Sequence, residues 1–553
     1  SPPGQREQVT SAFYQSILNA VKTGQKLNLH EADVLDYGVN ALWKQGIDGS
    51  GTTVAILLSS PDPQLPTVLS QYSAALGLPQ AQITMTQYPA SNPPATSCSF
   101  AQACGPGEDR LDAESIHTMA PYAKLLFVYT PVPETLGIQG WPQLGQAIEY
   151  VSSNHLADVI TISEGDAEAN FNPDPSDPGA AQTAEIHSLD PALLTAAANN
   201  VPLLFSSGDC GTTQVTLLNE QTQCWPNTPP SSGHPVDSPW VTSVGGTTPN
   251  PGIASPAGRT APDTLWNTGD LGNHNWDASG AGVSTVYSKP SYQQDVISLQ
   301  GTTGRSEPDI TMDGRDGTSQ SSPTLAGVLA LATQYHHGTL GTINPALYRL
   351  GPQGAAAGII PLQPGGSNGI DGLAGYTVGT SAFNIADGWG TIWAPTFVPA
   401  LSRTVDHQPA LQARTELGQL QSNTQVSATA GTVTVSGHGF VPGRMPNGSS
   451  MKIGFGFYPT LPGDPLIAPG VAVLTGAEST PGEPWDTVTA SLYTPAGRQA
   501  SSQVTVTAPD ADGNVTATVV TTGLAPGIYS LKLQGDDLTQ SARIIVRPPG
   551  RAH

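Results

Sequence analysis

The sequence predicts an α/β domain with a parallel sheet and helices on both faces, followed by an all-β sandwich of immunoglobulin-like type. In the first part of the chain, short apolar runs alternate with helix-length stretches, which is typical of repeated strand–helix units. In the last part, runs with a period of two are separated by turn residues, and no helix-length periodicity persists. At 553 residues, the chain also exceeds what one hydrophobic core usually serves. We therefore expect four segments: an N-terminal helical extension or linker remnant (1–28), the α/β domain (29–403), a polar linker (404–422) and the β-sandwich (423–553).

The elements of the first domain follow from apolar runs and their spacing. A predicted amphipathic helix over 5–22 precedes it, with apolar side chains at helical spacing: Val9, Phe13, Ile17 and Val21. Continuous apolar runs predict buried strands at 54–58, 125–129, 159–162 and 201–205. Between them we expect helices near 65–77, 108–119, 142–155 and 188–199. Sheets of this kind place their chemistry at the carboxyl ends of the strands, so the segments to search first follow Tyr129, Ile162 and Phe205.

The C-terminal part contains alternating runs at 432–436, 503–507 and 515–520, with turn signals such as Asp510-Ala-Asp-Gly513 between them. No catalytic set stands out in it. We expect a stabilising or surface-binding role for this part.

The charge balance is strongly acidic, with 20 Lys and Arg against 43 Asp and Glu and a formal net charge of −23. This balance argues against nucleic acid or an anionic membrane surface as a partner. Only 11% of the residues are charged, so the chain gains little repulsive charge in acid. No apolar run reaches the roughly 18 residues that a membrane-spanning helix needs.

The chain has four cysteines, and pairing by proximity gives Cys98–Cys104 and Cys210–Cys224. An even count in an acidic, lysine-poor chain favours disulfides and a secreted, extracellular protein, and four reduced buried cysteines is the alternative. No cysteine or histidine cluster has zinc spacing.

The sharpest local motif is Asp316-Gly-Thr-Ser-Gln-Ser-Ser-Pro323, followed by a predicted apolar helix over Thr324–Gln334. Such a turn presents the Ser319 hydroxyl at a helix N-terminus, where backbone N–H groups can meet an oxyanion. The alternative is that Ser319 or Ser322 only caps the helix.

A serine nucleophile needs a base. Subtilisin-like enzymes supply it in a His-Gly-Thr motif upstream of the serine, but here that motif lies past the helix, at His337-Gly-Thr339. None of the upstream histidines (His117, His155, His187 and His234) sits in a comparable motif. Carboxylates are therefore the candidate base.

Two segments supply these carboxylates. Glu108 and Asp112 are spaced i,i+4 on a predicted helix, which puts them on one face and close enough to share a proton. Asp209 lies in a glycine-flanked turn directly after the strand that ends at Phe205. The alternatives are that Glu108 and Asp112 only interact favourably with the dipole at the start of the helix, and that Asp209 only stabilises a turn.

Taken in order, Glu-x-x-x-Asp, Ser-Gly-Asp-x-Gly and Gly-Thr-Ser-x-x-x-Pro resemble the sedolisin family of serine-carboxyl peptidases, which has a subtilisin-like fold. Supporting matches are Pro239-Trp-Val-Thr-Ser-Val-Gly-Gly-Thr247, Ser279-Gly-Ala-Gly-Val-Ser284 and Tyr37-Gly-Val39. The resemblance covers roughly 29–403.

The resemblance implies roles for four residues. Ser319 would be the nucleophile, Glu108 its general base, and Asp112 the residue that orients Glu108 and shares a proton with it. Asp209 would be protonated and donate to the oxyanion together with the backbone N–H of Ser319. Such carboxyl groups can accept a serine proton or donate a hydrogen bond only in acid.

The chain also departs from the family pattern. Where family members often have Ser-Trp-Gly, this chain has Ser163-Glu-Gly165, and where they often have Glu at the end of the first strand it has Leu58. We interpret Glu164 as a candidate acid that supports the Glu108–Asp112 pair and does not itself touch the substrate. Family members bind calcium through two aspartates, and at these two places this chain has Ile360-Pro-Leu362 and Asn384. The metal is therefore left unassigned. Asp371 or Asp387 could supply a replacement ligand.

The resemblance thus implies a secreted, acid-acting endopeptidase that forms an acyl-enzyme and needs no cofactor for its chemistry. Its expected partners are polypeptide substrates and, before maturation, its own propeptide, of which residues 1–28 would be a remnant. We expect a monomer. The alternatives are a tripeptidyl-peptidase of the same family, a catalytically silent binding protein on the same fold, and a subtilisin-like peptidase with a histidine base.

Overall fold

The computed structural model describes residues 2–59, 61–88, 107–130, 140–168, 186–187, 189–212, 214–218, 221–225, 231–250, 262–269, 277–370, 374–405, 425–427, 432–437, 488–500, 504–508, 515–534 and 539–547. The chain forms two compact units, and each is described by itself. The first comprises 1–131, 150–168 and 199–408, and the second comprises 132–149, 169–198 and 409–553. The domain boundaries expected from the sequence stay predictions. Cys98, Cys104, Asp371 and most of the predicted linker lie outside the described residues.

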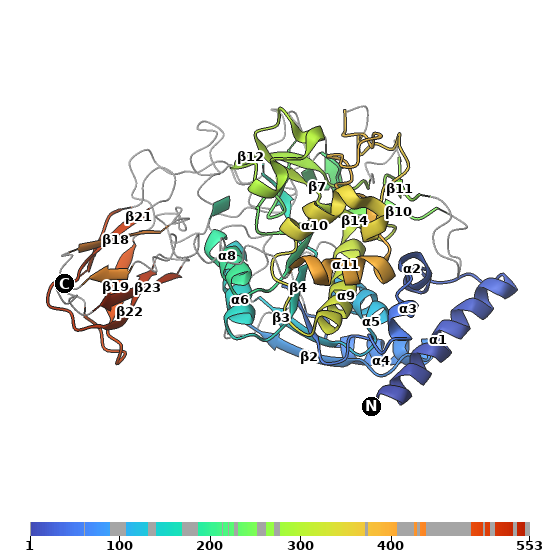
Figure 1. Cartoon of the computed structure of the whole chain (residues 1–553), viewed down its shortest axis with the longest axis horizontal. Helices are drawn as coiled ribbons and strands as arrows, with labels where there is room; N and C mark the ends of the chain where they lie inside the picture. Colours follow the sequence, from blue (N-terminus) through green and yellow to red (C-terminus); the bar gives the residue numbers. More distant parts are fainter. Residues whose placement is uncertain are drawn as a thin grey trace. The chain divides into compact units, whose positions relative to one another are not determined.

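An eight-stranded sheet forms the centre of the first unit (Figure 1). Its order is β11-β10-β6-β4-β1-β3-β2, with β14 also paired to β10, and every pair is parallel except β10–β11. The strands are β1 (Thr53–Leu58), β2 (Gln82–Gln87), β3 (Lys124–Tyr129), β4 (Val159–Ile162), β6 (Leu203–Ser206), β10 (Thr242–Thr248), β11 (Thr264–Leu265) and β14 (Ile310–Asp313). The four predicted strands are confirmed as β1, β3, β4 and β6.

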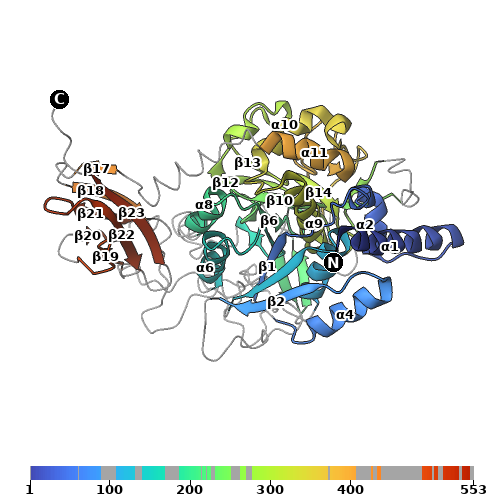
Figure 2. The ribbon, with the colours of Figure 1, turned by 60° about the horizontal axis from the view of Figure 1, so that its bottom comes forward.

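The strands that the sequence analysis missed lack a continuous apolar run. In β2, which lies at the edge of the sheet (Figure 2), half-buried Ile83 and Met85 alternate with polar residues. Strand β10 is buried but consists mainly of threonine, serine and glycine. Composition alone therefore marks only the strands that are apolar on both faces.

Helices alternate with these strands along the chain. They are α1 (Pro3–Thr23), α2 (Leu29–Tyr37), α3 (Asn40–Trp43), α4 (Leu65–Leu76), α5 (Glu108–Met119), α6 (Gly140–Ser153), α8 (Asp190–Ala198), α9 (Thr318–His336), α10 (Asn344–Leu350) and α11 (Ala394–Val405), with short 3₁₀ turns at Ser291–Gln293, Ile297–Leu299 and Gly351–Ala357. The predicted helices are confirmed as α1, α4, α5, α6 and α8. Smaller strand pairs are β5 (Asp166–Ala167) with β9 (Gly233–His234), β7 (Gln214–Leu218) with β8 (Gln221–Trp225), β12 (Gly282–Ser288) with β13 (Gly304–Glu307), and β15 (Ile359–Ile360) with β16 (Thr391–Ile392).

Helix α9 is the buried centre of the first unit, and α5 packs directly on it. Its residues from Gln320 to Thr333 are all buried. At Gly327 the two helices approach so closely that a Cβ atom would stand 2.6 Å from the Cβ of Met119. This contact joins the last turn of α5 to the middle of α9, and the candidate catalytic residues lie in the N-terminal turns of the same two helices.

Helix α1 packs against the first unit through Phe13 and Ile17, which are both buried. The ring of Phe13 lies 6.0 Å from that of Trp43, and Arg6 pairs with Asp48 at 2.8 Å. The expectation that Val21 shares this apolar face is wrong, because its side chain is 38% exposed. Val21 lies in the last turn of α1, past the buried contacts.

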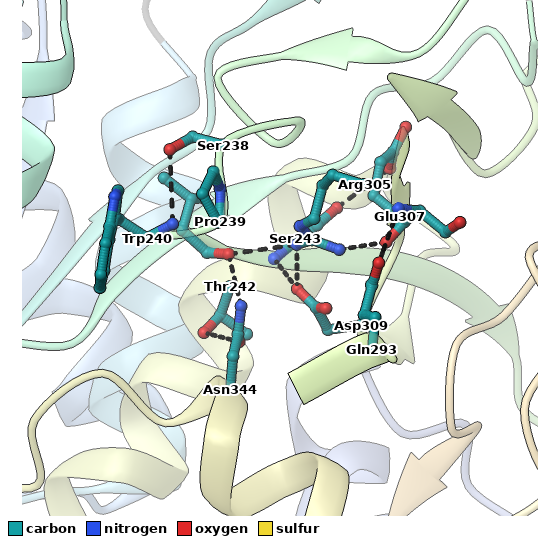
Figure 3. A network of polar contacts seen from close by, with 12 residues as sticks. Ser238, Pro239, Trp240, Thr242, Ser243, Gln293, Arg305, Glu307, Asp309 and Asn344 are labelled. Carbon is teal, nitrogen blue, oxygen red and sulfur yellow. Dashed lines mark hydrogen bonds and ion pairs between the residues drawn. The ribbon is translucent and has the colours of Figure 1, made fainter. Parts of the chain in front are cut away.

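Buried charges tie β10 to the segment that leads into β14 (Figure 3). The Arg305 guanidinium donates to Asp309 Oδ2 at 2.6 Å, and the Ser243 N–H donates to the same oxygen at 2.9 Å. Ser243 Oγ also donates to Glu307 Oε2 at 3.1 Å, and burial raises the pKa of Glu307 to about 7. Removing one partner of such a pair would leave an uncompensated buried charge, so the network fixes the position of β14.

The second unit contains a four-stranded sheet, β17-β23-β22-β19, and a three-stranded sheet, β18-β21-β20. One apolar core draws on both sheets, with Val435, Ala517 and Leu531 among its buried residues. The strands are β17 (Gln425–Ser427), β18 (Thr432–Gly437), β19 (Thr489–Tyr493), β20 (Val504–Val506), β21 (Val515–Val520), β22 (Gly527–Gln534) and β23 (Thr539–Arg547). The predicted alternating runs correspond to β18, β20 and β21.

Within the described ranges, no helix combines the length and the apolar character that crossing a bilayer requires.

Candidate active site

Four elements bring the predicted site residues, and with them Ser163, which was not predicted, to the carboxyl edge of the sheet. Ser163 follows β4, Asp209 follows β6, and Ser319 lies in the first turn of α9, shortly after β14. Glu108 and Asp112 lie in the first turns of α5, which packs on α9. The sequence analysis pointed to this edge because parallel strands end there together.

Helix α9 begins six residues earlier than predicted, at Thr318 rather than Thr324. Pro323 suggested a helix start, because proline favours the first turn. Instead it lies inside the helix, where its missing N–H leaves the carbonyl of Ser319 without its i+4 donor. Ser319 is therefore part of the helix, close to its positive end.

The carboxyl group of Glu108 lies against the nucleophile candidate. Burial raises the pKa of Glu108 to about 7, while hydrogen bonds from the hydroxyls of Ser319 and Ser163 act in the opposite direction. The other carboxylate oxygen, Oε1, is buried and has no hydrogen-bond partner among the described residues. The Ser319 hydroxyl thus lies near a group that can accept its proton.

Asp112 completes the carboxyl pair that the i,i+4 spacing predicted. Burial and then the charge of Glu108 raise the pKa of Asp112 well above its ordinary value. Ser163 Oγ donates to Asp112 Oδ1 at 2.9 Å. Two buried carboxyls at one place ionise in separate steps, so the pair retains one proton over a wide pH range.

Asp209 lies on the other side of the Ser319 turn. Its Oδ1 accepts from the N–H of Thr318 at 2.8 Å and from the Thr318 hydroxyl at 2.7 Å. Burial raises the pKa of Asp209 against these two hydrogen bonds. With Oδ1 occupied as an acceptor, Oδ2 is the oxygen that can carry a proton and donate it.

Gly317 is needed for this arrangement. Its φ of +82° suits glycine, and a Cβ atom there would stand 2.8 Å from Asp209 Oδ2. The Asp209 turn is itself held in place, because Cys210 and Cys224 form a disulfide and Ala278 donates its N–H to the Asp209 carbonyl at 2.8 Å. The predicted Cys210–Cys224 pairing is therefore confirmed.

Three of the described histidines, His117, His234 and His337, have places away from Ser319. His117 is buried against Ser73 Oγ at 3.1 Å and the Pro79 carbonyl at 3.0 Å, and burial lowers the pKa of His117 to about 4. His234 bonds to Asp237 at 2.7 Å, and His337 forms the C-terminal cap of α9, at the end opposite Ser319. The geometry thus favours a carboxylate base.

Two side chains at the site were missed. The Thr318 hydroxyl holds Asp209, and Ser163 contacts Asp112 where the sequence analysis named its neighbour Glu164. Glu164 is half-buried beside Ser163, and its assignment stays a prediction. The motif Ser163-Glu-Gly165 and its place after a strand were the available signals, but Ser163 and Asp112 are 51 residues apart in the chain.

Structural calcium requires six to eight oxygen ligands. Among the residues that the structure describes, no three His, Cys, Asp or Glu side chains are grouped to hold a metal ion. Asp387 is buried, burial raises its pKa to about 7, and its Oδ1 has no hydrogen-bond partner among the described residues.

Comparison with known proteins agrees with this geometry. The model of the Subtilase family matches residues 96–348. Kumamolisin of Bacillus sp. (strain MN-32) is 28% identical over 342 residues, covering 58% of this chain and 55% of kumamolisin. Sedolisin of Pseudomonas sp. (strain 101) is 30% identical over 363 residues, covering 62% of this chain and 56% of sedolisin. Human tripeptidyl-peptidase 1 is 28% identical over 292 residues, covering 45% of this chain and 43% of that protein.

The chain spans about half the length of the curated relatives it matches. A solved structure of Pseudomonas sedolisin, a serine-carboxyl proteinase complexed with two molecules of pseudo-iodotyrostatin, aligns with a TM-score of 0.54 at 26% identity. The alignment covers 65% of this chain and 94% of that structure. The fold is thus subtilisin-like α/β, and the chain is similar to serine peptidases of the sedolisin family.

Proposed function

We propose that this protein is an acid-acting serine-carboxyl endopeptidase. The observation that carries the proposal is the position of Ser319: its hydroxyl is close enough to Glu108 to lower the pKa of that carboxyl, and Asp209 accepts from the N–H of Thr318, the residue before Ser319. Nucleophile, base and acid donor thus come from three different elements and meet at one helix N-terminus. A helix cap or a turn-forming aspartate would not need this convergence.

The reaction would begin when Ser319 Oγ attacks the carbonyl carbon of a peptide bond and passes its proton to Glu108. The resulting oxyanion would accept hydrogen bonds from the Ser319 N–H and from protonated Asp209. Glu108 would then return the proton to the leaving amine, which leaves an acyl-enzyme. Water, deprotonated by Glu108, would release the acid product and restore Ser319.

Acid pH is favoured because the reaction needs two retained protons, one on the Glu108–Asp112 pair and one on Asp209. Burial raises the pKa of each of these three carboxyls, so both protons persist above the ordinary carboxyl range near pH 4. Above the second ionisation of the pair, or the ionisation of Asp209, the rate should fall.

The proposal also includes the location of the protein, the role of its second unit, its oligomeric state and its maturation. The Cys210–Cys224 bridge supports an oxidising, extracellular location. The two sheets of the second unit, with their common core, support an immunoglobulin-like accessory module with a stabilising or surface-binding role. We propose a monomer that acts on polypeptides and matures from a longer precursor.

The test is a pH–rate profile on a protein substrate, with mass analysis of the products. We expect hydrolysis to be fastest between about pH 3 and 6 and to fall toward pH 8. Internal cleavage products support an endopeptidase, whereas successive tripeptides would replace it by a tripeptidyl-peptidase. A rate that rises toward neutral pH would indicate a histidine base. If no peptide is hydrolysed at any pH, the alternative of a catalytically silent binding protein replaces the proposed function.

The Asp209→Asn variant tests the acid donor separately. An amide donates at any pH, so the alkaline limb of the profile should move to higher pH, although kcat itself should fall by up to about 10²–10³ if the geometry is imperfect. Profiles of the parent and the variant, measured on one substrate, decide the point. An alkaline limb that does not move would assign that limb to the Glu108–Asp112 pair instead.

A further inference from the structure

Ser163 occupies the space between the carboxyl pair and the backbone of the nucleophile. It follows the last residue of β4, and its Oγ lies 2.9 Å from Asp112 Oδ1 and 3.3 Å from the carbonyl oxygen of Ser319. The two acceptors belong to α5 and α9. One hydroxyl at the end of a rigid strand thus contacts both helices that carry the chemistry.

The sequence explains why Asp112 and the Ser319 carbonyl can each accept a hydrogen bond from Ser163. The Ser319 carbonyl lacks an intrahelical donor because Pro323 has no N–H. Asp112 lies in a buried setting with negative neighbours, namely Glu108 and Asp109 on its own helix. A further acid, Asp209 in the loop after β6, also raises the pKa of Glu108.

A hydroxyl carries a single proton and can donate it to only one of these acceptors at a time. The singly protonated pair carries a negative charge that makes Asp112 Oδ1 the stronger acceptor, so in this state the hydroxyl proton goes to Asp112. When the pair takes up a second proton, the Ser319 carbonyl becomes the better acceptor.

We propose that Ser163 is a positioning residue of the reaction, whose hydroxyl holds Asp112 while the pair is singly protonated and turns to the Ser319 carbonyl when the pair is fully protonated. The inference rests on the proposed function and deepens it. Ser163 stabilises the charged form of the pair, and it couples the protonation of Asp112 to the first turn of α9. It would act through Asp112 and Glu108 without touching the reacting atoms.

The sign of its effect follows from the hydrogen bond. Donation to the charged pair favours its ionisation, so the Ser163 hydroxyl lowers the pKa of Asp112. In Ser163→Ala the pair should hold its second proton to higher pH. The acidic limb of the kcat profile should then move up by about one pH unit.

The experiment compares Ser163→Ala, Ser163→Thr and a matched control. Ser163→Ala should lower kcat by about tenfold or more and leave KM within about twofold. Ser163→Thr keeps the hydroxyl and should return the acidic limb to its parental position. The control is Ser207→Ala, because Ser207 follows β6 as Ser163 follows β4, and its buried Oγ has no hydrogen-bond partner among the described residues.

A second readout does not depend on turnover. In the Ser319→Ala background, the carboxyl ¹³C shifts of labelled Asp and Glu report the ionisation of the pair directly. Adding Ser163→Ala should raise its first pKa, and adding Ser207→Ala should not. An unmoved acidic limb, or an unmoved titration, overturns the role of Ser163 even if the parent is an active peptidase. If the parent does not cleave peptides, the proposed function fails, and the titration still decides whether Ser163 controls the pair.

Discussion

Ser319→Ala is expected to reduce peptide hydrolysis by about 10⁴-fold or more, the scale seen when a serine nucleophile is removed. The substitution deletes one oxygen from a half-buried helix turn, so the free energy of unfolding should change by less than about 1 kcal/mol. The measurement is kcat/KM at the acid optimum together with thermal unfolding of the same preparation.

The matched control for Ser319 is Ser322→Ala, one turn further along α9. Ser322 Oγ is buried and bonds to the Thr161 hydroxyl at 2.8 Å, away from the carboxyl pair. Its loss should cost about 1 kcal/mol of stability and leave catalysis nearly unchanged. Near-normal turnover by Ser319→Ala would refute the mechanism as a whole.

Glu108→Gln is expected to lower kcat by 10² or more, which is the usual contribution of a general base. The amide keeps the shape of the side chain and can still accept a hydrogen bond from Ser319, but it cannot take the proton. KM should change little, because the substrate would not bind through Glu108. Single-turnover rates at the acid optimum measure this directly.

The same helix offers a control with an identical change of charge and shape. Glu114 lies on α5, and burial raises its pKa to about 7, as it does for Glu108. Its neighbour is His30, whose Nε2 lies 3.7 Å from Glu114 Oε2. Glu114→Gln should therefore retain kcat. If Glu108→Gln kept more than about a tenth of the parental rate, another residue must be the base.

The central sheet could be predicted where the sequence is apolar on both faces of a strand, as in 54–58 and 159–162. It could not be predicted for β10, whose small polar residues are buried by neighbours distant in sequence. The start of α9 was misplaced for a similar reason. Proline usually begins a helix, and only the surrounding structure supplies another donor for the carbonyl that Pro323 leaves unpaired.

The site itself was predictable as a set of motifs. The resemblance named Ser319, Glu108, Asp112 and Asp209, and the structure brings all four to one edge of the sheet. What a linear sequence does not contain is the distance between Ser163 and Asp112, since nothing in either motif refers to the other. Contacts of this kind arise from the packing of α5 on α9 against the end of β4.

Gly317 also bears on how related sequences are sorted into active and silent members. A Gly-Thr-Ser motif is usually inspected for its serine, yet any side chain at Gly317 would meet the Asp209 carboxyl. A relative that kept the serine but had alanine or a larger residue before the threonine would retain its nucleophile and lose its acid donor. Such a chain would pass a search for catalytic residues and still turn over poorly. For surveys of this family, the glycine is as informative a marker of activity as the serine two residues later.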